Sequence, residues 1–203
     1  HIEEPGLDLL CKSAIKSENL KAGTNPSEAD VFIIAVPTPF YPKTYAPNLE
    51  YIEKAINMIG PLLQKNNLII LESTSPVGTT EKLTKQILKL RPDLCCQINN
   101  DKIPNDNNAN EIYIAYCTER VLPGNILEEL INNPRIVGGI NKNSTQKALE
   151  FYKTFVKGPV IPTNSKTAEL TKLVENAYRD VNIAFANELS IICDKLDINI
   201  WEL

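Results

Sequence analysis

The sequence predicts an α/β fold in which a doubly wound, Rossmann-like parallel sheet is followed by one long helix. Along residues 1–163, short apolar runs rich in Ile and Val alternate with longer amphipathic stretches, the order that strands and helices follow in such a sheet. The strongest runs are almost continuous in apolar residues, as strands buried on both faces are. From residue 164 onward, the apolar residues instead follow helical periodicity for about 30 residues without an internal Gly or Pro.

Six strands are predicted from the apolar runs. The strong candidates are residues 31–36 (VFIIAV), 68–73 (LIILES) and 112–117 (IYIAYC). The weaker candidates are residues 20–23 (LKAG), 134–139 (PRIVGG) and 159–163 (PVIPT). Between the strands, helical patterns fall near residues 6–18, 49–65, 77–90, 124–132 and 144–156.

The long helix is predicted over residues 165–196, with Asn164 or Ser165 as its N-cap. Because an average helix has roughly 11–12 residues, we interpret this one as a connection between domains or as an oligomer contact. The segment 97–111 is dense in Asn and Asp and almost without apolar residues. This composition predicts an exposed loop, with a lid over the site as the alternative.

The composition excludes several classes of protein. Apolar residues make up 43% and charged residues 23% of the 203 positions, as in folded soluble domains. The net charge of −4 offers no basic surface for nucleic acid, and no apolar run approaches the roughly 18 residues of a membrane span. The five cysteines form no CxxC or Cys/His pattern, which favours a reducing cytoplasm and unreactive thiols. Since the only histidine is His1, an internal histidine base and a histidine-rich metal site are excluded, and no metal-binding residue is predicted.

Polar residues follow the first two strong strands, at the edge where a doubly wound sheet binds its ligands. Thr38 lies in the Pro-rich segment 37–40, which a rigid turn would also explain. Ser75 and Pro76 suit the N-cap and first position of a helix. Thr74 would then lie between the strand end and the positive end of a helix dipole, where an anion or a polar ligand is stabilised.

Charged residues follow the third strong strand and recur on the long helix. Glu119 and Arg120 lie at the end of that strand, after Thr118, either as a surface ion pair or as part of a ligand site. Lys172, Asn176 and Arg179 are spaced i, i+4 and i+7, so they share one helix face within roughly 60°. A solvated polar stripe is the alternative, but an ammonium, an amide and a guanidinium suit a phosphorylated, hydroxyl-rich ligand.

Four segments carry a resemblance to a known family. They are AVPTPF, ILESTSPVGTTE, ERVLPGN with PRIVGG after it, and KLVENAYRDVNIAFANEL. In this order, over nearly the whole chain, they resemble the nucleotide-sugar (UDP-glucose/GDP-mannose) dehydrogenases, which oxidise the C6 alcohol of a UDP- or GDP-sugar to a carboxylate with two NAD⁺. The ERVLPGN form is similar to the branch that acts on UDP-N-acetyl-D-mannosamine. The UDP-N-acetylglucosamine branch tends to carry an acidic residue where Leu122 stands.

The resemblance implies a role for each candidate residue. Thr38 and Thr74 would contact NAD. Lys172, with Asn176 beside it, would be catalytic and would stabilise the oxyanion of the thiohemiacetal and thioester steps. Glu119 would act as the general base that helps water hydrolyse the thioester. The residues implied in substrate binding are Arg120, Val121, Lys172, Asn176 and Arg179.

Several parts of the family are expected outside this chain. Its first strand, its GxGxxG loop and the acidic residue that reads the adenosine ribose would precede residue 1. Its nucleophilic cysteine and UDP-binding domain would follow residue 203. We therefore expect a partial NAD-binding Rossmann-like domain over residues 1–163, the start of a central helical dimerisation domain over 164–203, and no catalysis by this chain alone. Thr118 also stands where the family usually has proline.

The function implied by the resemblance is NAD-dependent oxidation of UDP-N-acetyl-D-mannosamine to its uronic acid, for cell-surface polysaccharide synthesis. The enzyme is expected to be a cytoplasmic homodimer that associates through the long helix, with no nucleic acid, membrane or metal as a partner. One alternative is a UDP-N-acetyl-D-glucosamine 6-dehydrogenase. The other, from a different class, is a nonenzymatic module that binds sugar nucleotides or another protein.

Overall fold

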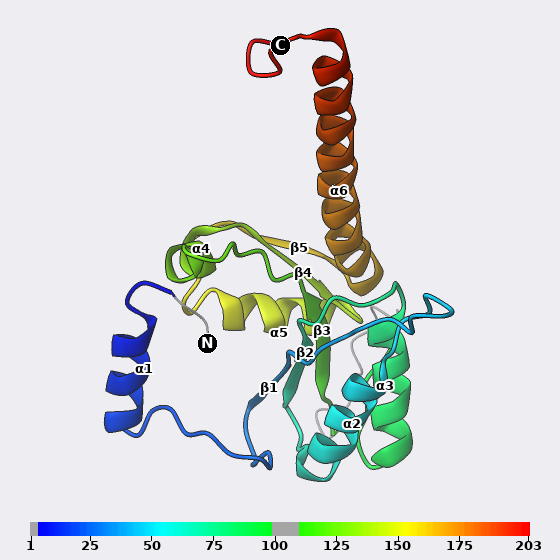
Figure 1. Ribbon diagram of the computed structural model, residues 1–203. Coiled ribbons are helices and arrows are strands. Elements are labelled where there is room, and N and C mark those ends of the chain that lie inside the picture. The colour runs from blue at the N-terminus through cyan, green and yellow to red at the C-terminus, as the bar shows by residue number, and fades with distance from the viewer. Residues whose placement is uncertain (1–3, 99–109) are drawn as a thin grey trace.

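The computed structural model describes residues 4–98 and 110–203, so most of the predicted loop 97–111 lies outside the described residues. Five strands form one sheet in the order β1-β2-β3-β4-β5 (Figure 1). They are β1 (Val31–Ile34), β2 (Leu68–Leu71), β3 (Tyr113–Cys117), β4 (Arg135–Gly139) and β5 (Val160–Asn164). The α/β class is confirmed, and each strand overlaps a run predicted as a strand.

The directions of two strands, β4 and β5, differ from the prediction of a parallel sheet. β1, β2 and β3 are parallel, but β4 runs antiparallel to β3, and β5 is parallel to β4. The connection between β3 and β4 contains only the seven-residue helix α4 (Ile126–Asn132). Because this short helix does not cross a face of the sheet, β4 starts beside the end of β3 and runs back along it.

The prediction of a strand at residues 20–23 is wrong. These residues have no regular secondary structure, and they are exposed to solvent. The sheet of the described residues ends at β1 on that side. Strands are stabilised by pairing and by burial of one face, and this short run with a Lys and a Gly has neither.

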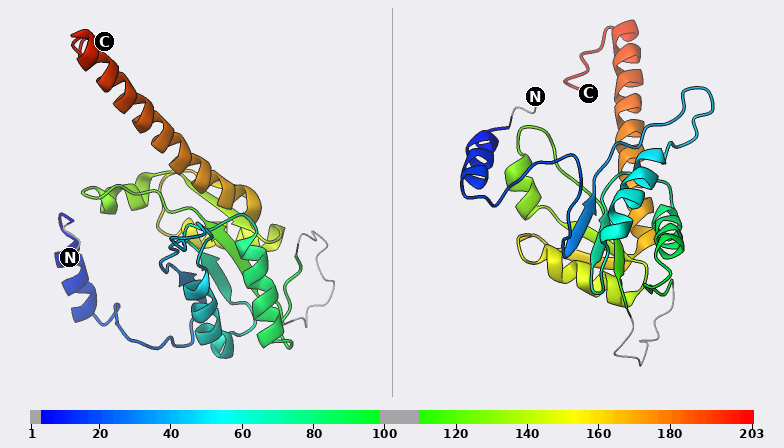
Figure 2. Two further views of the ribbon diagram at one scale, coloured as in Figure 1. Left: turned by 45° about the vertical axis from the view of Figure 1, so that its right-hand side comes forward. Right: turned by 90° about the horizontal axis from the view of Figure 1, so that it is seen from below.

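Helices cover both faces of the sheet. α2 (Glu50–Ile59) and α3 (Thr79–Leu90) pack on one face, and α5 (Lys142–Tyr152) packs on the other (Figures 1 and 2). β2 shows the consequence, because its side chains alternate between the two cores. Ile69 and Leu71 join the α2–α3 core, whereas Leu68 and Ile70 join the α5 core. This two-sided burial explains why the run is apolar at every position.

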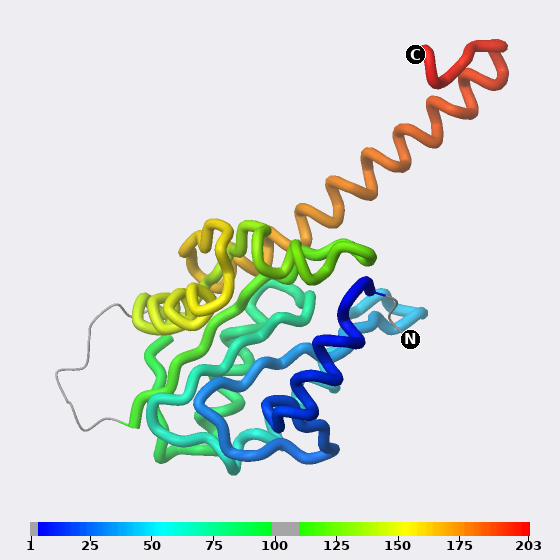
Figure 3. Tube along the Cα trace, turned by 90° about the vertical axis from the view of Figure 1, so that its left-hand side faces the viewer, coloured from blue at the N-terminus to red at the C-terminus, as the bar shows by residue number. Residues whose placement is uncertain are grey.

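The two terminal helices lie mostly outside this core. α1 (Leu7–Lys16) has no buried residue. α6 (Ser165–Leu196) begins on the sheet and then projects away from it (Figure 3). The Asn164 side chain accepts the Thr167 N–H over 2.9 Å, which confirms Asn164 as the N-cap. At 1.5 Å per residue the helix is roughly 48 Å long, so most of its length extends past the sheet.

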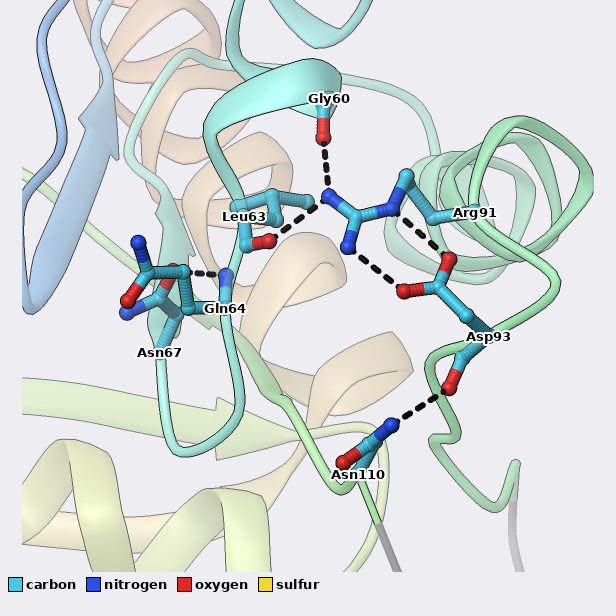
Figure 4. A network of polar contacts seen from close by, with 7 residues as sticks. All are labelled: Gly60, Leu63, Gln64, Asn67, Arg91, Asp93 and Asn110. Atoms are coloured by element: carbon cyan, nitrogen blue, oxygen red, sulfur yellow. Dashed lines mark hydrogen bonds and ion pairs between the residues drawn. The ribbon is translucent and has the colours of Figure 1, made fainter.

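Arg91 joins three segments at the edge of the sheet where β3 begins (Figure 4). Its guanidinium donates to the carbonyl oxygens of Gly60 over 3.1 Å and Leu63 over 2.7 Å. It also donates two bonds, of 2.8 and 2.6 Å, to the Asp93 carboxylate, which hold the pKa of this exposed carboxyl below its usual value. The Asp93 carbonyl accepts the Asn110 side chain over 3.2 Å. The network thus fixes the ends of α2 and α3 and the chain that enters β3.

Candidate functional site

The carboxyl ends of β1 and β2 meet at one edge because these strands are parallel. The Thr38 hydroxyl donates to the Thr74 carbonyl over 2.5 Å, and the Ser73 hydroxyl donates to the Val36 carbonyl over 2.7 Å. These bonds join the loop after β1 to the loop after β2. The structure therefore brings Thr38 and Thr74 together, and their contact with NAD stays a prediction.

The start of α3 differs from the prediction that Ser75 and Pro76 are its N-cap and first residue. The helix begins at Thr79, and its N-cap is Gly78 with a φ of 91°. The Thr79 N–H donates to the Pro76 carbonyl over 3.2 Å, so residues 76–79 form a turn before the helix. The left-handed conformation of Gly78, which glycine adopts without a steric cost, is what prevents the helix from starting earlier.

Glu169, from the second turn of α6, occupies the N-terminus of α3. Its carboxylate accepts the backbone N–H groups of Gly78 over 2.6 Å and Thr80 over 2.7 Å, and also the Thr80 hydroxyl over 2.7 Å. Glu169 is 0% exposed. Helix N-termini stabilise anions through their dipole and their unpaired N–H groups. The part of the expectation that places a ligand anion at this helix end beside Thr74 is therefore wrong, because the chain's own carboxylate fills the position. That Thr74 contacts a polar ligand stays a prediction.

A second group of polar residues surrounds an open pocket of about 710 Å³ between α6 and the loop after β3. Four of the five residues implied in substrate binding line it, whereas the fifth, Asn176, is exposed outside the lining. The four are Arg120, Val121, Lys172 and Arg179. Apolar surface comes from Leu122, Pro134, Tyr178, Ile183 and Ala186.

Two consecutive loop residues contact α6 at this pocket. The Lys172 ammonium donates to the Glu119 carbonyl over 2.6 Å, and the Arg120 guanidinium lies 2.9 Å from the Glu175 carboxylate. The Glu119 carboxylate accepts the backbone N–H of Val121. The structure thus brings Glu119, Arg120 and Lys172 into one cluster, and their catalytic and binding roles stay predictions.

The same loop is held from the other side by α4. The Leu122 N–H donates to the Glu129 carboxylate over 2.8 Å, and the Asn133 side chain donates to the Arg120 carbonyl over 2.8 Å. Sequence reasoning missed Glu129, Asn133 and Glu175. Two signals could have found them: the i, i+4 spacing of Glu129 and Asn133 shortly after the ERVLPGN segment, and the position of Glu175 three residues after Lys172.

Thr118, where the family usually has proline, fixes the start of the loop. Its backbone N–H donates to the Ile136 carbonyl over 3.3 Å, a bond that proline cannot make. Its side chain is buried, and the hydroxyl has no hydrogen-bond partner among the described residues. The backbone bond keeps the loop attached to β4 directly before Glu119.

The thiols of the core do not resemble nucleophiles. Burial raises the pKa of Cys117 to about 11 and that of Cys96 to about 12, and a protonated thiol is a poor nucleophile. Within residues 4–98 and 110–203, no group of three His, Cys, Asp or Glu side chains could hold a metal ion. No helix in that part of the chain is both long and apolar enough to cross a membrane.

Comparisons with known proteins cover both parts of the chain. Residues 1–156 match the UDP-glucose/GDP-mannose dehydrogenase family, NAD binding domain, and residues 166–203 match the central domain of that family. The whole chain is 54% identical to a UDP-N-acetyl-D-mannosamine dehydrogenase of Campylobacter jejuni and covers 48% of it. It is 48% identical to an NDP-N-acetyl-D-galactosaminuronic acid dehydrogenase of Ralstonia nicotianae and covers 46% of that protein.

The fold is shared with solved structures. A UDP-D-ManNAc dehydrogenase from Pyrococcus horikoshii matches with a TM-score of 0.87 at 36% identity, over 100% of this chain and 46% of that chain. The present chain therefore spans about half the length of the curated relatives it matches.

Proposed function

This chain belongs to the UDP-glucose/GDP-mannose dehydrogenase family, and from this premise we propose that it forms part of an NAD-dependent enzyme that oxidises the C6 alcohol of UDP-N-acetyl-D-mannosamine to the uronic acid. The observation that carries the proposal is the pocket that Arg120, Lys172 and Arg179 line together. The guanidinium groups of Arg120 and Arg179 would bind phosphate oxygens, and the Lys172 ammonium would act at the reacting end of the substrate. Such a pocket suits the diphosphate of a sugar nucleotide.

The identity of the sugar is proposed from the pocket wall and from the relatives. Leu122, an apolar residue, lines the pocket where the UDP-N-acetylglucosamine branch tends to have an acidic one. The relatives from C. jejuni and P. horikoshii both carry mannosamine in their names. These two observations favour UDP-N-acetyl-D-mannosamine over UDP-N-acetyl-D-glucosamine.

NAD is the cofactor implied by the family's NAD binding domain, and the residues at the carboxyl edge fit it in part. Thr38 and Thr74 present small polar groups where β1 and β2 end, and they would hold NAD there. The N-terminus of α3 is already occupied by Glu169, so it does not fit the pyrophosphate. No GxGxxG segment occurs in residues 1–203. When bound, NAD⁺ accepts the hydride that leaves C6.

We therefore expect this 203-residue chain on its own to bind NAD⁺ more weakly than micromolar. Two threonine hydroxyls contribute about 1–3 kcal/mol, whereas association costs at least about 4 kcal/mol in lost freedom. Isothermal calorimetry with the purified chain measures the affinity directly. A micromolar isotherm would contradict the expectation and would require a pyrophosphate site among these residues.

In the proposed mechanism, Lys172 and Glu119, which contact each other, have two different roles in the reaction. The Lys172 ammonium, which now donates to the Glu119 carbonyl, would stabilise negative charge that develops on the substrate oxygen. Asn176, one turn further along α6, would donate a hydrogen bond beside it. One oxygen of the Glu119 carboxylate accepts the Val121 N–H, and the other would take a proton from the water that hydrolyses the thioester.

We also propose a cytoplasmic homodimer that serves cell-surface polysaccharide synthesis, with residues 1–163 as NAD-binding domain and 164–203 as the start of the dimerisation domain. The support for a dimer is the apolar surface of α6 beyond the sheet. Exposed large apolar side chains there include Val174, Tyr178, Val181, Phe185 and Ile192. Several exposed large apolar side chains on one helix are typical of a protein contact.

The substrate is tested in a hybrid enzyme in which residues 1–203 replace the matching segment of the C. jejuni relative. We expect NADH formation with a kcat/KM at least about 10-fold higher for UDP-N-acetyl-D-mannosamine than for UDP-N-acetyl-D-glucosamine or UDP-glucose. The matched variant Leu122→Glu, in the same hybrid, should reduce this preference. Fastest turnover of UDP-N-acetyl-D-glucosamine would favour that alternative, and binding of UDP-sugars without NADH formation would favour a nonenzymatic module.

A further inference from the structure

Residues 118–125 form a loop without helix or strand. Side chains from two helices nevertheless hold the backbone of this loop. Lys172 of α6 donates to the Glu119 carbonyl, and Glu129 of α4 accepts the Leu122 N–H. Arg120 lies between these two anchors. The loop is therefore fixed on both sides of Arg120 before any ligand binds.

Arg120 itself is held at both of its ends. At the backbone, the Asn133 amide nitrogen donates to the Arg120 carbonyl over 2.8 Å and to the Glu129 carboxylate over 3.2 Å. At the side chain, the guanidinium lies 2.9 Å from Glu175. Asn133 comes from the C-terminal end of α4, whereas Glu175 comes from α6.

The Asn133 contact depends on the chemistry of an amide. Its NH₂ group has two hydrogens, and it has two acceptors within hydrogen-bond distance, the Arg120 carbonyl and the Glu129 carboxylate. An aspartate of the same shape has no hydrogen to donate. It would also add a negative charge beside a carboxylate and a carbonyl oxygen, so the loop would be pushed away from α4.

The Glu175 contact leaves the guanidinium able to bind a ligand. The Arg120 and Glu175 side chains are 35% and 29% exposed, and both residues line the pocket. A guanidinium has five N–H donors, and the contact with Glu175 involves one of its terminal nitrogens. The remaining donors stay available for a phosphate oxygen. Holding a long side chain in place in the free protein reduces the entropy that is lost when a ligand binds.

We infer that Asn133 and Glu175 are positioning residues for substrate binding, which clamp Arg120 from its backbone and its side chain and so direct its guanidinium into the pocket. The inference rests on the proposed function, because it takes the pocket as the site of an anionic sugar nucleotide. Neither residue needs to touch the substrate. Their effect passes through Arg120, and this is what distinguishes them from residues that only stabilise the fold.

The test uses the hybrid enzyme with Asn133→Asp, Glu175→Ala and Glu175→Gln. We expect Asn133→Asp and Glu175→Ala to raise the KM for the UDP-sugar by about 10-fold, the effect of one well-placed hydrogen bond. The kcat should stay within about 3-fold and the KM for NAD⁺ should not change. Glu175→Gln keeps an oxygen that accepts the guanidinium hydrogen bond, so its KM should lie between those of Glu175→Ala and the unmodified hybrid.

Two neighbours serve as matched controls. Asn132 is the last residue of α4 and precedes Asn133, and Glu188 lies further along α6; both are exposed and neither lines the pocket. We expect Asn132→Asp and Glu188→Gln to leave both KM values unchanged. These controls separate the effect of the clamp from a general effect of changing charge on either helix.

A double-mutant cycle shows whether the clamp acts through Arg120. In an Arg120→Ala background, Glu175→Ala and Asn133→Asp should add no further increase in the KM for the UDP-sugar. A full additional increase in that background would overturn the inference. So would an unchanged KM accompanied only by a lower melting temperature, which is the result of a purely structural role.

A failure of the proposed function can be distinguished from a failure of the clamp. If the unmodified hybrid oxidises no UDP-sugar, the proposed reaction is wrong, but the clamp can still be measured with UDP as the probe. Calorimetry should then show about 10-fold weaker UDP binding for Glu175→Ala and for Asn133→Asp than for the unmodified hybrid. Equal affinities for UDP would reject the clamp.

Discussion

Glu169 and Glu175 lie less than two turns apart on α6, and each places a carboxylate against a loop at the carboxyl edge of the sheet. Their surroundings differ. Glu169 is 0% exposed and accepts three hydrogen bonds at the N-terminus of α3. Glu175 is partly exposed, contacts one guanidinium and lines the pocket. The same side chain on the same helix therefore stabilises the fold at one position and prepares a binding residue at the other.

The largest effect is expected when the buried contact is removed. Glu169→Ala leaves the Gly78 and Thr80 N–H groups and a buried hydroxyl without their acceptor, which should lower the free energy of unfolding by about 3–5 kcal/mol. Urea denaturation of the 203-residue chain measures this loss. Glu188→Ala, an exposed position on the same helix, should change the free energy of unfolding by less than about 0.5 kcal/mol. Similar losses for the two variants would mean that the buried contacts of Glu169 do not stabilise the fold more than an exposed glutamate does.

A kinetic effect of comparable size is expected at Lys172, between the two glutamates. In the hybrid enzyme, Lys172→Ala should lower kcat by about 10²–10³ while the KM for the UDP-sugar changes much less, since its ammonium is proposed to act on charge that develops in the transition state. Steady-state kinetics give both numbers. Turnover at the unmodified rate would remove Lys172 from the mechanism.

A moderate loss of stability without a kinetic effect is expected at Arg91, at the opposite edge of the sheet. Arg91→Ala removes the bonds to the Gly60 and Leu63 carbonyls and should lower the free energy of unfolding by about 1–2 kcal/mol. Arg91 also lowers the pKa of Asp93 in the folded state. That part of the stability is present above the unfolded pKa of the carboxyl and is lost as pH falls through its folded pKa.

The difference between Arg91→Ala and the unmodified chain should therefore shrink in acid. Urea denaturation at neutral pH and again below the usual pKa of an aspartate measures this change. A difference that stays constant or grows on acidification would mean that the Arg91–Asp93 pair does not contribute to stability.

The smallest change in stability is expected at Glu175. Because the Arg120–Glu175 pair is partly exposed, Glu175→Ala should lower the free energy of unfolding by less than about 1 kcal/mol. Urea denaturation of this variant in parallel with Glu169→Ala measures the difference between the two glutamates. A loss as large as that of Glu169→Ala would mean that Glu175 is a structural residue, and the clamp on Arg120 would lose its support.

Much of the fold follows from local patterns that the sequence contains. The apolar runs predicted β1, β2 and β3, because a strand buried on both faces must be apolar at successive positions. The helical period and Asn164 predicted α6 and its first residue, because an N-cap acts within a few residues. The position of Thr38 and Thr74 at one edge of the sheet also followed from the sequence, since the carboxyl ends of parallel strands lie at the same edge.

Which distant side chain contacts each loop depends on the packing of the elements in three dimensions. Glu169 lies 89 and 91 positions from the N–H groups that it accepts, and Lys172 lies 53 positions from Glu119. The direction of β4 depended likewise on the short helix α4. The start of α3 depended on the left-handed conformation of Gly78. The periodicity of a sequence shows which face of a helix or strand is apolar. It does not show where two helices or strands cross in space. For that reason the positions of α4 and α6 against the loops, and not the sequence pattern, determine that Glu169 fills the N-terminus of α3 and that Asn133 and Glu175 contact Arg120.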